Sequence, residues 1–105
     1  MKLTRTDLMN QLTRAYCDTK RVHMRYSAWV NALAKHRAGD PTALHRATPC
    51  NENTRRRLYD LARGLRFEIN NVREEDGVEL LPTGTISRLS EVTAILRAAE
   101  SLMQR

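Results

Sequence analysis

The chain has 105 residues, of which 41% are hydrophobic, so it can form one helical domain (1–105) with a modest core but not two domains. Its net charge is +6, and it has no stretch apolar enough for a membrane span or a signal-sequence core. We therefore expect a cytoplasmic protein without a membrane partner, in which two cysteines are too few for a disulfide framework.

The first third of the chain predicts one long amphipathic helix, Thr4–Arg37. Apolar residues recur at steps of three and four from Leu8 to Leu33, and no Gly or Pro occurs before Gly39. Thr4 is the expected N-cap, because Asp7 follows it by three residues as in a capping box.

A hydrophobic staple and a short linker helix are predicted at the two ends of this segment. Leu3 and Leu8 have the spacing of a staple around the N-cap. After the first helix, Asp40-Pro41 resembles an N-cap followed by proline at the first helical position. We expect a short helical turn from Pro41 to about Ala47, ending before Pro49.

A second long helix is predicted over residues 51–75 and a last helix over Thr85–Met103, with Thr85 as N-cap. Asp76-Gly77 is a turn signal, and the connector 78–84 contains one possible extended piece at 78–81. The second helix should bury a stripe roughly 100° wide. Its members are Leu58, Leu61, Ala62, Leu65, Ile69 and Val72.

These elements predict an all-α fold, namely a small helical bundle with one long N-terminal amphipathic helix, a short linker helix and a C-terminal antiparallel helical hairpin. At ~1.5 Å per residue the first helix spans ~50 Å, longer than the ~36 Å and ~30 Å of the others. Either it breaks near its middle, or the short helix covers the overhang, or its apolar face meets another chain in a homo-oligomer, a dimer or higher. The expected interface consists of Leu12, Val22, Tyr26, Trp29 and Leu33.

The positive charge is concentrated in the first two thirds of the chain. Residues 1–66 carry +9 and residues 67–105 carry −3, and arginine makes up 15 of the 18 basic residues. Arginine with interleaved aromatic residues on one helix face is typical of phosphate neutralisation and base stacking. The predicted nucleic-acid site is therefore Arg55, Arg56, Tyr59, Arg63 and Arg66; the alternative is a solvated charged face.

A second basic ridge lies on the first helix, opposite its apolar stripe. Its members Arg14, Arg21, Arg25 and Lys35 contribute solubility or further contacts with nucleic acid. No zinc-finger, RNA-recognition or helix-turn-helix pattern is present, so binding should depend on shape and charge.

Chemistry at a metal or a nucleophile is not expected. No two of the histidines and cysteines have the spacing of a ligand pair, and nothing orients His45 toward Cys50. We expect no catalytic residue, no metal, no cofactor and no small-molecule substrate.

The sequence thus favours a non-catalytic accessory or regulatory protein that binds nucleic acid through its arginine-rich helix face. The alternative is a protein–protein interaction module, an inhibitor or assembly factor of a bacterial or mobile-element complex, which acts through helical surface contacts.

Overall fold

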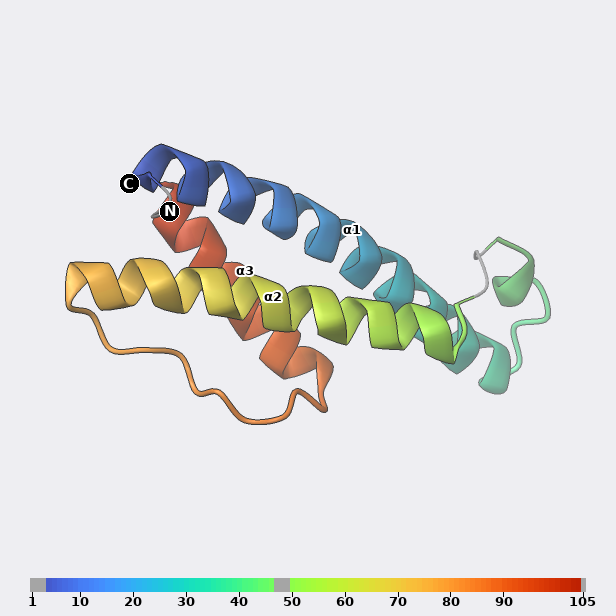
Figure 1. The fold of residues 1–105 in the computed structure, drawn as a ribbon. Helices are drawn as coiled ribbons and strands as arrows, with labels where there is room; N and C mark the ends of the chain where they lie inside the picture. The colour runs from blue at the N-terminus through green and yellow to red at the C-terminus, as the bar shows by residue number, and fades with distance from the viewer. Residues whose placement is uncertain (1–3, 47–49, 105) are drawn as a thin grey trace.

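The computed structural model describes residues 4–46 and 50–104 of the chain. The elements in these ranges are α1 (Arg5–Arg37), the short 3₁₀ helix η1 (Ala43–Arg46), α2 (Glu52–Asp76) and α3 (Leu89–Met103). No strand occurs in the described ranges, so the prediction of an all-α helical bundle is confirmed. The bundle is elongated, with extents of 53 × 24 × 23 Å, and α1 runs along its length (Figure 1).

The first helix is continuous over 33 residues and does not break near its middle. Its N-cap is Thr4, as predicted: the side-chain oxygen accepts from the Asp7 N–H at 3.1 Å, and the hydroxyl donates to the Asp7 carboxylate at 2.8 Å. The helix ends at Ala38, whose N–H bonds back to carbonyls of the last turn. Leu3, the other half of the predicted staple with Leu8, lies outside the described residues.

The linker helix begins later than predicted. Asp40 folds its carboxylate over the next residues, accepting from the Thr42 N–H at 3.0 Å and from the Thr42 hydroxyl at 2.8 Å. This side-chain turn takes the place of the first helical turn expected at Pro41, so η1 starts at Ala43. The predicted end at Ala47 lies outside the described residues.

The second helix agrees with the prediction at both ends. Asn51 is the N-cap and accepts from the Thr54 N–H at 3.2 Å. Gly77, with φ of 70°, ends the helix in the left-handed conformation that glycine adopts without strain. The predicted apolar stripe faces the core, and all of it is buried except Leu61, which is partly buried.

The last helix starts at Leu89, four residues later than predicted, and Thr85 is not its N-cap. The Glu91 carboxylate accepts from the N–H groups of Ser87 at 2.8 Å and Arg88 at 3.4 Å, which fixes the first turn there. Ile86 is buried in the core but lies before the helix, in the connector. It was counted in the helical pattern because it is apolar, although it packs on the core from a non-helical segment.

The connector between α2 and α3, residues 77–88, runs back along α2. The Tyr59 hydroxyl, in the first half of α2, donates to the Ser87 carbonyl at 3.4 Å, so α3 begins beside that half of the helix. From there α3 crosses behind α2 toward α1 (Figure 1). The antiparallel neighbour of α2 in the C-terminal region is thus the connector, whereas the prediction gave this place to the last helix.

The three long helices share one apolar core, and each contacts the other two. Two residues of the predicted oligomer interface belong to this core: Leu12 is fully buried and Val22 nearly so. The prediction that these two side chains form an oligomer interface is therefore wrong, because both are buried in the intramolecular core. Tyr26 packs partly buried against the same core, and Trp29 and Leu33 are partly buried farther along α1.

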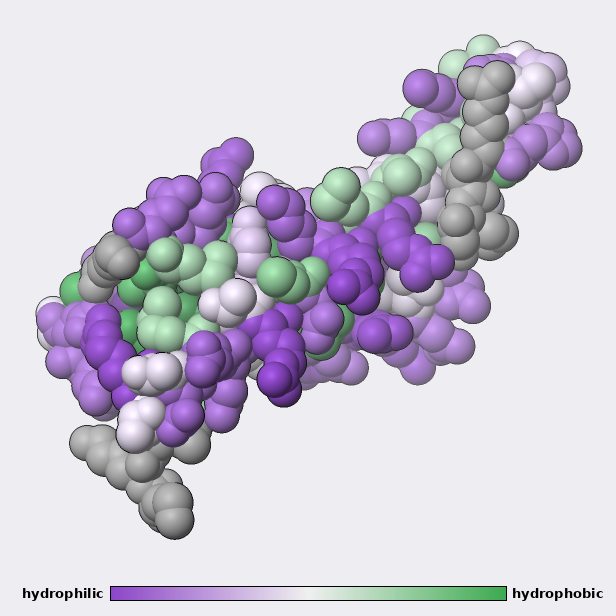
Figure 2. Space-filling view, turned by 90° about the horizontal axis from the view of Figure 1, so that it is seen from above, coloured by the Kyte–Doolittle hydropathy of each residue, from purple (hydrophilic) through white to green (hydrophobic). Residues whose placement is uncertain are grey.

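The C-terminal end of α1 reaches past α2. The Cys50 thiol, which precedes α2, lies 3.6 Å from the carbonyl oxygen of Arg25, so residues 26–37 form a projecting end beyond the start of α2. The η1 helix packs against this projecting end, where Ala32 is buried. Apolar residues nevertheless continue along its surface (Figure 2).

Candidate nucleic-acid interface

The predicted binding face of α2 also holds the connector in place. The Arg66 guanidinium donates to the Gly84 carbonyl at 2.8 Å and to the Thr83 carbonyl at 3.5 Å. Tyr59 donates to Ser87 as described above. Two of the five predicted binding residues therefore position a second segment of the chain against α2.

The same face continues toward the end of α2 with Arg73, which helical spacing places with the other arginines of this face, and with Asn70, which the sequence does not single out. The Asn70 side chain donates to the Leu81 carbonyl at 3.2 Å and accepts from the Leu81 N–H at 2.8 Å. Arg73 donates to the Glu79 carbonyl at 3.0 Å. Positions 59, 66, 70 and 73 share one helix face by their spacing, but this pattern alone does not separate holding a loop from binding a ligand.

A basic groove of about 410 Å³ lies between α2 and the connector. Its α2 wall includes the predicted residues Arg56, Tyr59, Arg63 and Arg66, and its other wall is the segment 83–86. Asp60 is the acidic residue among the lining side chains. The groove therefore brings together four of the five predicted residues, with three positive charges against one negative charge.

Two of the groove arginines are available to an anion. Arg56 is exposed and makes no hydrogen bond or ion pair with any described residue. Arg63 pairs with Asp60, but their side chains are 59% and 63% exposed, and ion pairs so open to solvent contribute little. Arg63 can therefore exchange this carboxylate for another anion at small cost.

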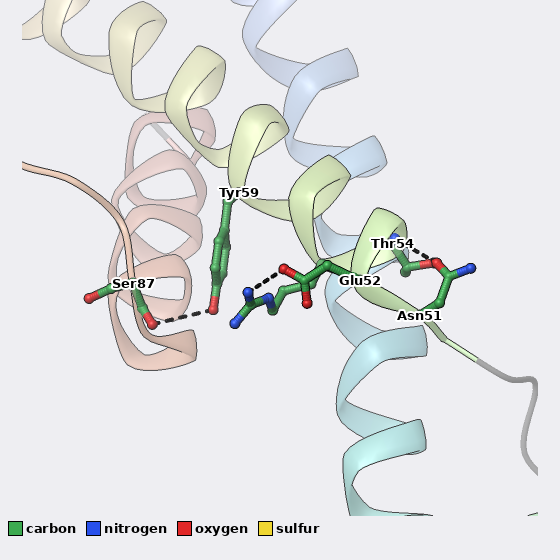
Figure 3. A network of polar contacts seen from close by, with 6 residues as sticks. Asn51, Glu52, Thr54, Tyr59 and Ser87 are labelled. Carbon is green, nitrogen blue, oxygen red and sulfur yellow. Dashed lines mark hydrogen bonds and ion pairs between the residues drawn. The ribbon is translucent and has the colours of Figure 1, made fainter.

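Arg55, the fifth predicted residue, is not part of the groove lining. It forms an ion pair with Glu52, which raises the pKa of the Arg55 guanidinium, and it lies over the Tyr59 ring at 5.8 Å from the centroid. Figure 3 shows the Tyr59 hydroxyl directed at the Ser87 carbonyl. The Nε atom of Arg55 is buried without a hydrogen-bond partner among the described residues. Arg55 thus supports the position of Tyr59 beside the Ser87 carbonyl.

The segment 83–86 could not be assigned to the site from the sequence. It has no charged residue and no periodicity that associates it with α2, and its contacts with Arg66 span 17 and 18 positions of the chain. The structure shows that it forms one complete wall of the groove.

The remaining candidates do not assemble into a second site within the described residues. Arg14, Arg21, Arg25 and Lys35 are exposed on α1, as expected for a basic ridge. In the described part of the chain, no three His, Cys, Asp or Glu side chains converge as metal ligands would. None of the described helices combines the length and the apolar character that a membrane crossing requires.

Comparisons with protein families, curated proteins and solved structures found no match to this chain.

Proposed function

We propose that this protein is a non-catalytic accessory or regulatory protein that binds nucleic acid in the basic groove between α2 and residues 83–86. The observation that carries the proposal is the convergence of Arg56, Arg63 and Arg66 on one groove beside Tyr59. Arginine presents a planar fork of donors that matches phosphate oxygens, and its charge persists at every physiological pH.

The three arginines have different roles in this proposal. Arg56 and Arg63 contact phosphates, because the former makes no hydrogen bond or ion pair with a described residue and the latter has an exposed, weak ion pair. Arg66 holds the opposite wall through two carbonyls and adds its positive charge to the groove lining. Binding of this kind is driven by charge and counterion release and has little dependence on base sequence.

The test is fluorescence anisotropy of labelled DNA and RNA over a salt series. The variant Arg56→Gln/Arg63→Gln removes the two available charges and leaves Arg66, which holds the connector, untouched. Each lost phosphate contact lowers the slope of log K against log salt by ~0.9 for duplex, so this variant should lose roughly two units of slope.

The matched control is Arg14→Gln/Arg21→Gln, which removes the same charge from the exposed ridge of α1. Its affinity should fall much less than that of the groove variant. A complementary variant, Asp60→Asn, removes the acidic side chain of the groove and frees Arg63, and it should bind more tightly than the wild type. Absence of binding at low salt, or equal losses in the groove and ridge variants, would exclude the basic groove as the site.

A second candidate function is a protein–protein interaction module that uses the projecting end of α1. This is favoured by Val30, which is 38% exposed, beside the partly buried Trp29 and Leu33. The first partner to test is a second copy of the chain, by light scattering over a range of protein concentrations. Val30→Glu should shift an oligomer toward monomer, whereas a monomeric wild type would rule out this self-association.

A further inference from the structure

A second hollow lies on the other side of the connector from the basic groove. It has a volume of about 240 Å³ and is formed by the connector and α3. Its walls are largely apolar side chains, contributed by Leu81, Pro82, Ile86, Ala94 and Ile95. We call it the apolar hollow.

The two hollows meet along one shared wall. Arg66, Gly84, Thr85 and Ile86 line both of them. A ligand that lies across this wall meets positive charge on one side and an apolar surface on the other. Such a ligand needs an anionic group joined to an apolar, compact body.

The two charged side chains at the apolar hollow already make hydrogen bonds within the fold. Arg66 donates to the Gly84 and Thr83 carbonyls, and Glu91 accepts from two N–H groups at the start of α3. The hollow therefore offers mainly surface contact, which suits the face of a nucleobase, and little hydrogen bonding that would select one base.

We propose that the apolar hollow receives an unpaired base of a single nucleic-acid strand whose phosphates lie on Arg56 and Arg63. This inference rests on the proposed function of the basic groove and extends it to a strand type. In a duplex the bases are stacked and paired, and placing one in the hollow requires it to leave the stack. The protein therefore prefers a single strand to a duplex of the same sequence.

The experiment compares three labelled probes of about twelve nucleotides, a length within the usual site size of single-strand binding proteins. The probes are a thymidine strand, an abasic strand with the same number of phosphates, and a thymidine–adenine duplex. Because the abasic strand keeps the phosphates and lacks the bases, it separates phosphate binding from base binding, and a variant of the apolar hollow then locates the base. The thymidine strand should bind roughly fivefold more tightly than the abasic strand, the gain expected from burying ~40 Å² of base surface against aliphatic side chains.

The variant Ala94→Leu fills the apolar hollow from α3 without touching the groove arginines. Ala94 is exposed and lines the apolar hollow but not the basic groove, so the larger side chain should be accepted by the fold, which circular dichroism verifies. It should lower affinity for the thymidine strand to that of the abasic strand and leave abasic binding unchanged. The matched control is Ala34→Leu, at an exposed position of α1 outside both hollows, which should keep the difference.

The outcomes separate this inference from the proposed function. Equal binding of the thymidine and abasic strands by the wild type, or tighter binding of the duplex, overturns the role of the apolar hollow and leaves the basic groove intact. Absence of binding to all three probes at low salt overturns both. Equal binding of the thymidine and abasic strands by the wild type overturns the role of the apolar hollow whether or not Ala94→Leu folds.

Discussion

Replacing Asn70 with alanine should destabilise the protein by detaching the connector from α2. The Asn70 side chain makes two hydrogen bonds with the backbone of Leu81, at 3.2 Å and 2.8 Å, in a partly buried setting. A typical hydrogen bond of this kind contributes about 1 kcal/mol net, so the pair contributes about 2 kcal/mol. For a domain of this size such a loss lowers the midpoint of thermal unfolding by roughly 10 °C.

The control for this prediction is the neighbouring residue, Asn71→Ala. Asn71 lies in the same helix at similar partial burial and makes no side-chain hydrogen bond with a described residue, so both variants gain the same helix propensity from alanine. Urea unfolding followed by circular dichroism gives the free energy of unfolding of each variant. If the two variants differ by less than about 0.5 kcal/mol, the Asn70 bonds do not hold the connector and the reasoning fails.

Three further substitutions test the core, the helix interior and the pH response. Thr19 is fully buried and its hydroxyl has no hydrogen-bond partner among the described residues, so Thr19→Val should raise the free energy of unfolding by about 1 kcal/mol; a loss of stability would show that the hydroxyl is satisfied. Gly64 lies inside α2 with open space where the methyl group of an alanine would stand, so Gly64→Ala should raise the unfolding free energy by up to about 1 kcal/mol in the same assay. Burial lowers the pKa of His23 below its ordinary value, so the unfolded chain takes up the proton at a higher pH than the folded protein. Stability should therefore be full above about pH 6.5 and fall as the pH drops through the folded-state pKa, and His23→Gln should remove this part of the slope in urea titrations; an unchanged slope would contradict the assignment.

The helix boundaries that the sequence predicted correctly are those whose cap is a residue type preferred at that position. Thr4, Asn51 and Gly77 each cap a helix through contacts with residues three or four positions away, so a short stretch of sequence is enough to predict them. The start of the last helix was predicted wrongly because threonine is a preferred N-cap residue and Thr85 lies just before the apolar pattern. The helix begins instead at Leu89, because the Glu91 carboxylate accepts from the N–H groups of Ser87 and Arg88.

The candidate site was predictable as a face but not as a groove. Helical spacing placed Arg56, Tyr59, Arg63 and Arg66 on one face, and in the structure these four residues line one hollow. Their separate roles could not be predicted, because Arg66 donates to the carbonyls of residues 83 and 84, which are 17 and 18 positions away in the sequence. No local pattern distinguishes an arginine that holds a loop from one that faces solvent.

The contacts that fix the connector have one property in common. On the connector side, α2 binds main-chain groups throughout, namely the carbonyls of Glu79, Leu81, Thr83, Gly84 and Ser87 and the N–H of Leu81. Side chains of the connector are not needed for these bonds, so α2 fixes the main chain of this segment, while Ile86 and Leu81 add apolar contacts with the core. The exposed positions Thr83 and Thr85 can therefore be exchanged to alter what the groove accepts, while α2 keeps the wall in the same place.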